Sequence, residues 1–222
     1  MRALPGMFLA ALLTTALTNG TVAQQLRDDS YRWYIAPQAG ILVFETPSQT
    51  RSAIPVVGAQ AMILGKRGGL IASVEEAFGD DEASAFAESG ATGGARSVSF
   101  DRLRKYSATL MAYPIQAQVE PYLGVGYGIL HTVGTQVGGI FTDPAEAANA
   151  AGAANERGST GFASFTGGVQ ARLTARAVLF GQYQITTAPA SGKLLMGPTH
   201  TLVAGVRLGL GTAKEGIRGG GY

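Results

Sequence analysis

Apolar and polar residues alternate along much of this chain, which is the pattern of β-strands whose two faces meet different surroundings. The stretch from Val119 to Leu130 shows it most clearly. Apolar or aromatic residues occupy one face, at Val119, Pro121, Leu123, Val125, Tyr127 and Ile129. The other face carries Glu120, Tyr122, Gly124, Gly126 and Gly128. The stretch therefore predicts a strand with one apolar face and one face of polar and very small residues.

The same alternation recurs in seven further stretches. The clearest are 161–173, 177–186 and 200–210, the stretch 33–44 is noisier, and those near 53–64, 69–78 and 104–115 are weaker. Between Ala177 and Thr186, the apolar residues Val178 and Phe180 interrupt the polar face. The eight stretches have about 9 to 12 residues each, the length that a tilted strand needs to cross a bilayer.

The connections between these stretches alternate between long and short. The long ones are 45–52, 79–97, 131–160 and 188–200, and the short ones are 65–68, 116–118 and 174–176. Outer-membrane barrels have long outer loops and short periplasmic turns, whereas a soluble sandwich has no reason to follow this rule. The pattern predicts an all-β fold, an eight-stranded antiparallel up-and-down transmembrane β-barrel. Residues 144–156, rich in Ala and Asn, are expected to form a mobile or briefly helical segment.

Residues 1–23 have the features of a cleavable secretory signal peptide. Arg2 supplies the positive charge, residues 7–17 are apolar, and Thr21 and Ala23 place small residues three before and one before a cut. A retained membrane anchor is the alternative. We expect residues 24–30 to lead into a barrel of residues 31–211, followed by a polar periplasmic tail at 212–222. After Ala23 no run of about 18 apolar residues follows, so strands closed into a barrel would have to cross the membrane.

Composition narrows the classes of function. Charged residues make up 14% of the 222 residues, against roughly 25% in soluble globular proteins. A net charge of +2 without a long basic cluster does not indicate a nucleic-acid partner. The lack of cysteine excludes disulfides, thiolate metal sites, a thiol nucleophile and a lipoprotein anchor. With only His131 and His200 in the chain, we expect no metal centre and no cofactor.

Two stretches carry a family resemblance, Glu120 to Gly128 (EPYLGVGYG) and Thr201 to Leu210 (TLVAGVRLGL). They resemble strands of the small outer-membrane β-barrel family, to which the OmpA transmembrane domain and OmpX belong. The resemblance implies a bacterial outer-membrane location, contact with membrane lipid and lipopolysaccharide, and insertion by the barrel-assembly machinery. It implies little about activity. Such barrels usually end on a terminal aromatic, whereas here the last stretch stops at Leu210 and a polar tail follows.

Four charged residues fall on inward-facing positions of the predicted strands. Glu120 opens one strand and Arg172 closes its neighbour, so both are expected near the periplasmic end as a buried or half-buried pair. Arg207 and Glu75 are expected as further lumen charges. Each needs a partner, because burying an unpaired charge carries a large desolvation cost. We favour a polar plug, since eight strands leave no aqueous channel by default; the alternative is an ion-selective pore or proton path.

Arg102, Arg104 and Lys105 lie near the outer end of the fourth predicted strand. There they are candidates for contact with lipopolysaccharide phosphates, and the alternative is an ordinary charged rim. The acidic run 79–82 offers carboxylates for a divalent cation but lacks the spacing of a calcium loop, so a solvated loop is expected.

His131 and His200 fall near the loop-proximal ends of strands. A lipid-modifying barrel enzyme would need a Ser, a His and an acid within hydrogen-bond reach, and Ser159, Ser164 and Asp143 are the nearby residues of those types. No nucleophile motif surrounds them. We therefore expect rim histidines, no catalytic residue and no enzyme activity.

The sequence thus predicts an outer-membrane barrel with a structural or interaction role. It would present its outer loops to lipopolysaccharide or to a protein partner that the sequence does not identify. Three alternatives stay open: a narrow pore or hydrophobic-solute conduit, a lipid-modifying barrel enzyme, and a soluble periplasmic barrel that binds an apolar ligand.

Overall fold

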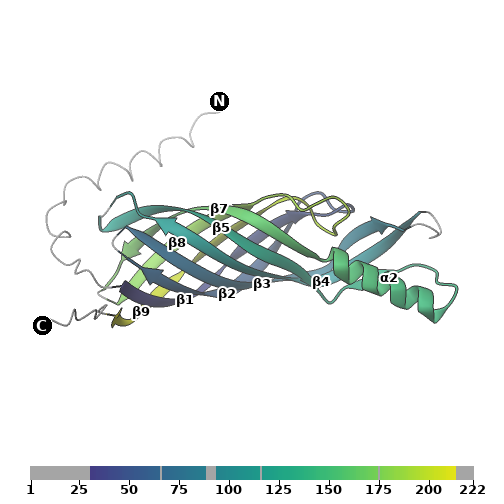
Figure 1. Ribbon diagram of the computed structural model, residues 1–222, viewed down its shortest axis with the longest axis horizontal. Coiled ribbons are helices and arrows are strands. Elements are labelled where there is room, and N and C mark those ends of the chain that lie inside the picture. Colours follow the sequence, from purple (N-terminus) through teal and green to yellow (C-terminus); the bar gives the residue numbers. More distant parts are fainter. Residues whose placement is uncertain (1–30, 66, 89–93, 116, 175, 214–222) are drawn as a thin grey trace, which may run out of the picture.

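A computed structural model describes residues 31–65, 67–88, 94–115, 117–174 and 176–213 (Figure 1). The predicted signal peptide at 1–23, the lead-in at 24–30 and most of the predicted tail lie outside these residues. No helix of the described part is long and apolar enough to cross a membrane.

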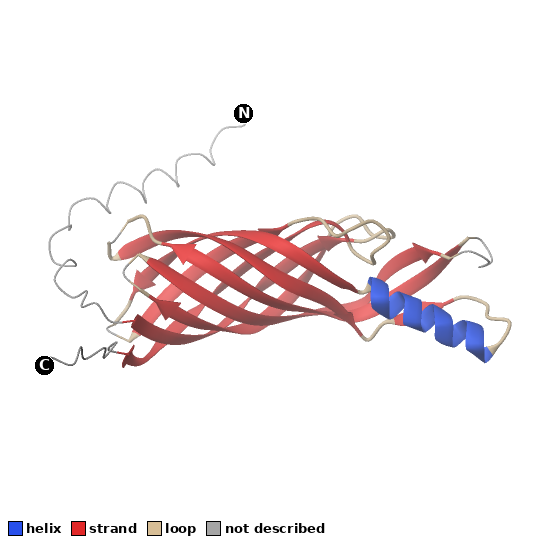
Figure 2. Ribbon diagram, in the orientation of Figure 1, coloured by secondary structure: helices blue, strands red, loops and turns tan. Residues whose placement is uncertain are grey.

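Among the residues that the structure describes, eight long strands form a closed antiparallel barrel, which confirms the predicted fold class. Figure 2 shows these strands wrapped into the barrel wall. They are β1 (Tyr31–Glu45), β2 (Ser52–Leu64), β3 (Gly68–Ala87), β4 (Ala95–Ala112), β5 (Val119–Val133), β7 (Ser159–Arg172), β8 (Ala177–Thr186) and β9 (Met196–Ala213). Each pairs with its neighbours in sequence, β1 pairs with β9 to close the ring, and short β6 (Gln136–Gly138) adds to β4. The remaining element in the described ranges is α2 (Pro144–Arg157). We call the end with the long connections the loop end, and the other the turn end.

The two faces of each strand meet different surroundings, as the alternation predicts. On β5, Leu123, Val125 and Tyr127 are half or more exposed on the outer wall, whereas Glu120 and Tyr122 are buried in the lumen. The outer wall is therefore a broad apolar surface. The parity predicted for β1, β7, β8 and β9 holds as well, including the lumen positions of Val178 and Phe180.

The inward glycines of β5 leave room for larger side chains from the neighbouring strands. A Cβ on Gly124 would clash with Met111 of β4, and one on Gly128 would lie 3.0 Å or less from the Phe162 ring of β7. Bare backbone at these positions thus allows a narrow barrel to hold bulky residues.

Apolar clusters fill the lumen at both ends of the barrel. The cluster toward the loop end consists of Leu42, Phe44, Ile54, Val56, Ala77, Phe100, Leu103, Leu130, Phe162, Leu195 and Val203. The cluster toward the turn end consists of Tyr34, Met62, Leu64, Ile71, Met111, Tyr113, Tyr122 and Val178. Gln38, on β1 between Tyr34 and Leu42, marks the level of a buried polar layer between the two clusters. Side chains therefore occupy the lumen along its length.

Several strand boundaries differ from the sequence prediction, most of all between β3 and β4. The expected long loop at 79–97 is wrong, because β3 continues to Ala87 and β4 begins at Ala95, and the two pair beyond the barrel as a hairpin. A bulge between Phe78 and Glu82 separates the hairpin from the wall and contains the acidic run, with Asp81 at φ 51°. The last strand runs past Leu210 to Ala213, because its backbone pairs with the first residues of β1 whatever side chains it carries.

Candidate functional site

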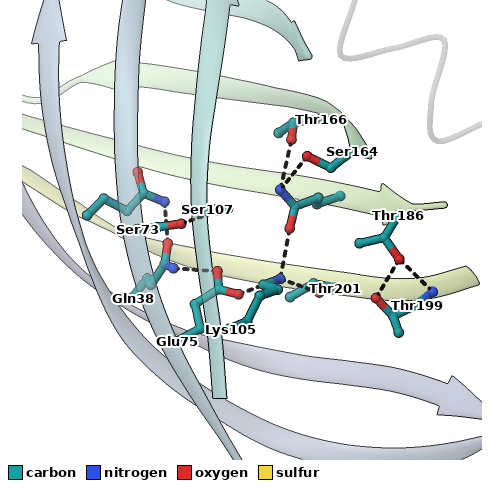
Figure 3. A network of polar contacts seen from close by, with 12 residues as sticks. Gln38, Ser73, Glu75, Lys105, Ser107, Ser164, Thr166, Thr186, Thr199 and Thr201 are labelled. Atoms are coloured by element: carbon teal, nitrogen blue, oxygen red, sulfur yellow. Dashed lines mark hydrogen bonds and ion pairs between the residues drawn. The ribbon is translucent and has the colours of Figure 1, made fainter. Parts of the chain in front are cut away.

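Lys105 is the centre of the buried polar layer (Figure 3). Its Nζ lies 2.5 Å from Glu75 Oε2 and donates to Gln184 Oε1 and Thr201 Oγ1, each at 2.8 Å. Glu75 also accepts a hydrogen bond of 2.7 Å from Gln38 Nε2. The buried ammonium group is thus compensated by one ion pair and two hydrogen bonds, as a fully buried lysine requires.

The layer connects opposite walls of the barrel. Gln60 of β2 donates to Gln38 of β1, and Gln184 of β8 donates to Ser164 and Thr166 of β7. Together with Glu75 on β3, Lys105 on β4 and Thr201 on β9, these groups reach every wall strand except β5. We call this set the Lys105 network. Because β5 contributes inward glycines, it leaves the space that the network fills.

A second polar cluster surrounds Arg207, which has no exposed surface. Its guanidinium donates to Gln170 and, at 3.2 Å, to the Tyr122 hydroxyl, and it lies 4.2 Å above the Phe180 ring. Gln170 in turn donates to Glu120 at 2.7 Å. The amide of Gln170 thus links a buried cation to a buried carboxylate.

The predicted lumen charges divide between these two clusters. Arg172 lies 3.4 Å from Glu120, and its side chain is 34% exposed while that of Glu120 is buried. Arg207 joins that pair through Gln170, whereas Glu75 belongs to the Lys105 network.

Placing Lys105 among the lipopolysaccharide contacts is a wrong prediction. Its side chain is 1% exposed and faces the lumen, while Arg102 and Arg104 face outward with side chains 42% and 37% exposed. Successive residues of a strand point to opposite faces, so adjacent Arg104 and Lys105 cannot share one. The signal in the sequence that could have given the correct orientation is Tyr106. Its aromatic side chain faces outward, so the neighbouring Lys105 has to face the lumen.

A row of polar residues crosses the outer wall near the loop end. Strand register places Glu76, Arg104, His131 and Ser159 side by side on β3, β4, β5 and β7. Glu76 accepts hydrogen bonds from Arg104 at 3.1 Å and from Arg102 at 3.0 Å. Arg102 lies two positions from Arg104 on β4, closer to the loop end. We call these five residues the rim row. Two guanidinium groups share one carboxylate, so the Arg and Glu members carry a net positive charge.

The residues of a possible hydrolase do not assemble. His131 Nδ1 lies 2.6 Å from Ser159 Oγ, but Ser164 is buried in the lumen and Asp143 caps α2. His200 stacks on Tyr183 and contacts its hydroxyl at 2.5 Å. Within the described ranges, no carboxylate hydrogen-bonds to either histidine, and no group of His, Asp and Glu is placed to hold a metal ion.

Beyond the loop end, the long connections pack into a small structured unit. Helix α2 begins at Pro144 because Asp143 accepts from Glu146 N at 2.8 Å, and its many alanines favour helix. Its Ala154 packs with Phe86 and Val98 of the hairpin and with Leu194 of the last long connection. We call α2, β6, the hairpin beyond the bulge and Leu194 the loop platform. Figure 1 shows α2 beside the projecting hairpin.

Arg96 fastens α2 to the hairpin. Its side chain is almost fully buried and donates to Glu88, to Glu146 and to the Ile140 carbonyl, and it lies 4.6 Å from the centre of the Phe141 ring. The hydrogen bond to Glu88, with further contributions from Glu146, raises the pKa of Arg96. Hydrogen bonds from Thr142, and then from Arg96, lower the pKa of Glu146 to about 2. Both groups are therefore charged at neutral pH.

The remaining connections are tied to the same unit. Ser84 Oγ donates to Leu194 O at 2.7 Å, and Thr46 Oγ1, in the first long connection, donates to Ala83 O at 2.5 Å. The Arg157 guanidinium lies 4.6 Å from the centre of the Phe86 ring. All four long connections are thus linked by named contacts.

A closed eight-stranded barrel with an apolar outer wall and a side-chain-filled lumen is the fold of the small outer-membrane β-barrels. The structure of neisserial surface protein A (NspA) aligns with a TM-score of 0.53 and 13% identity, covering 79% of this chain and 96% of that one. Two further structures align with TM-scores of 0.42 and 13% identity. They are Ail, the attachment invasion locus protein of Yersinia pestis (82% of this chain, 100% of that one), and a major outer membrane protein from Thermus thermophilus (81% and 99%).

No family model matches the sequence, and no curated protein matches it. At 13% identity the likeness to NspA concerns the fold alone.

Proposed function

We propose that this protein is a bacterial outer-membrane barrel with an interaction role, performed by its loop end. It is exported through a cleaved signal peptide and inserted by the barrel-assembly machinery. The observation that carries the proposal is the loop platform, a structured unit that stands beyond a barrel whose lumen is occupied by side chains. The broad apolar outer wall supports a place in the membrane, because a soluble protein rarely exposes so large an apolar surface.

The construction of the platform supports a binding role. Its segments are held by a small apolar core, by the ion pairs of Arg96 and by hydrogen bonds between connections. A surface that is ordered before it meets a partner has less conformational entropy to lose on binding. The charged groups of the lumen, in contrast, are engaged with one another and face away from any partner outside the barrel.

Lipopolysaccharide is the partner that the rim row favours. Arg102 and Arg104 present half-exposed guanidinium groups near the loop end, and guanidinium binds phosphate through paired hydrogen bonds. Lys105 has no part in this contact.

The pore alternative is less well supported, because apolar clusters fill the lumen above and below the Lys105 network. The enzyme alternative lacks an assembled Ser, His and acid among the described residues. The soluble-barrel alternative conflicts with the apolar outer wall.

Binding of the purified, folded protein to immobilised lipopolysaccharide tests the proposal. We expect the double variant Arg102→Gln/Arg104→Gln to bind about tenfold more weakly, which corresponds to about 1.4 kcal/mol. Arg176→Gln removes the same type of charge from the turn end and is the matched control. Wild-type binding by the double variant, or no binding by the wild type, would overturn the lipopolysaccharide contact.

A further inference from the structure

A groove of about 770 Å³ hollows the outer wall of the barrel between β1 and β5. Alanines form its floor: Ala59, Ala61, Ala72 and Ala108. Register aligns Ala61, Ala72 and Ala108 in one row across β2, β3 and β4, with Tyr127 of β5 next in the row. Larger side chains form the walls: Ile35, Val74, Tyr106, Tyr127 and Ile129. The groove is therefore a shallow apolar channel, and the described residues that line it carry no charge.

The groove lies directly below the rim row on the same outward face. Ala108, Tyr106 and Arg104 follow one another at every second position of β4, and on β5 Tyr127, Ile129 and His131 do the same. Ala108 lies four positions along the strand from Arg104, which is about 13 Å. The apolar floor and the cationic rim are thus two ends of one continuous surface.

The charge of the rim selects an anionic head group. Arg102 and Arg104 share the single carboxylate of Glu76, so these three side chains together carry one net positive charge. Both guanidinium groups keep exposed surface toward the outside. Tyr106, 45% exposed, stands between the rim and the floor, and Tyr127, 64% exposed, stands at the end of the floor row. The rings of both residues suit the boundary between an apolar and a polar layer.

We propose that this surface is a binding site for one phosphorylated glycolipid of the outer leaflet, lipid A. One acyl chain lies on the alanine floor between Tyr106 and Tyr127, and a phosphate binds Arg104 and Arg102. The inference rests on the proposed lipopolysaccharide contact and deepens it by assigning the acyl chain to a defined groove. A phosphate ion alone would not fill the apolar groove, and an uncharged lipid would not pair with the arginines.

Native mass spectrometry of the full mature chain in detergent counts the bound lipids. The probes are hexa-acylated lipid A with both phosphates, the same lipid without phosphates, and inorganic phosphate as competitor. Ala72→Leu/Ala108→Leu raises the floor of the groove, and Ala204→Leu, on the outer wall of β9 and outside the groove, is the matched control. Arg102→Gln/Arg104→Gln tests the head-group contact.

We expect the double Leu variant to reduce lipid A occupancy about tenfold, and Ala204→Leu to leave it unchanged. The arginine variant should reduce binding of phosphorylated lipid A and leave the small occupancy of the phosphate-free lipid as it is. Heat-dependent migration on SDS gels checks that each variant is folded. If the double variant does not fold, the single variants Ala108→Met and Ala61→Leu take its place.

The other outcomes separate the two proposals. If the arginine variant loses lipid A and the Leu variants do not, the rim contact stands and the groove assignment fails. If neither variant differs from wild type, both fail. A dimer in the spectrum that the Leu variants dissociate would assign the groove to a second copy instead, and full competition by inorganic phosphate would rule out an acyl contribution.

Discussion

Lys105 Nζ lies 2.5 Å from Glu75 Oε2, and the two residues are register partners on the neighbouring strands β4 and β3. Both side chains are buried, and Lys105 Nζ donates two hydrogen bonds, to Gln184 and Thr201 on the far wall. The ion pair is therefore the point at which two opposite walls of the barrel are joined through its lumen.

Removing one member of this pair should cost far more than removing both. Lys105→Met leaves the Glu75 carboxylate buried without its cation, so we expect the free energy of unfolding to fall by about 3–5 kcal/mol. The double variant Glu75→Gln/Lys105→Met should be more stable than Lys105→Met alone. Urea unfolding in detergent, followed by the fluorescence of Trp33, the only tryptophan, measures both. Additive losses in the double-mutant cycle would contradict a coupled pair.

Replacing an inward glycine of β5 even by alanine should lower the free energy of unfolding. A Cβ at Gly124 would meet Met111, would lie 2.8 Å from Thr109 Cγ2 and would crowd a backbone carbonyl, so Gly124→Ala should destabilise the barrel by about 1–3 kcal/mol. Gly181→Ala is the matched control, because nothing lies within 4 Å of its Cβ position. It should be neutral or stabilise by up to about 1 kcal/mol. Equal effects at both sites, measured by the same unfolding assay, would refute the packing argument.

A charge on the outer wall should be penalised according to its depth. Val125 is 60% exposed near the middle of β5, and Val133 stands at the loop end of the same strand. In lipid bilayers, Val125→Arg should lower the free energy of unfolding by about 2–4 kcal/mol and Val133→Arg by about 0–1 kcal/mol. In a soluble barrel both changes would face water and stay within about 0.5 kcal/mol. Equal, small effects of the two substitutions would therefore indicate a soluble barrel.

The loop platform should loosen in acid before the barrel does. Because the pKa of Glu146 is lowered from 4.5 to about 2, its carboxylate stabilises the docked α2 above about pH 4.5, and this contribution is lost as the pH falls through about 2. Pepsin cleavage within residues 139–158, normalised to an unfolded substrate, should accelerate between about pH 4 and 2. Glu146→Gln should be cleaved faster at about pH 4 and show little further change. Identical pH profiles for the variant and the wild type would exclude Glu146 as the group responsible.

Disrupting Arg96 should release the platform at neutral pH as well. Arg96→Met removes the donors to Glu88, Glu146 and the Ile140 carbonyl, so amide exchange in α2 should become faster. Exchange in β1 and β9 should not change, because those strands make none of these contacts. Protection of α2 equal to that of the wild type would show that the apolar core alone holds the helix.

The outer wall and the polar lumen face followed from alternation alone. Once one strand has an apolar face, a slip of one residue would turn all its side chains to the wrong side, so parity is strongly determined by local pattern. This is why Glu120, Arg172, Arg207 and Glu75 could be assigned to the lumen without a structure. The same rule, applied from Tyr106, would have placed Lys105 there too.

What the sequence by itself determined is therefore the number of strands in the wall, their faces and the end at which the long connections lie, because each depends on neighbouring residues only. Tertiary structure decided which inward groups meet. Lys105 reaches Gln184 and Thr201 across 79 and 96 positions of chain, and only closure of the barrel brings them within hydrogen-bond distance. The platform and the alanine groove have the same origin, since contacts and rows that cross several strands depend on register and packing between segments far apart in the chain.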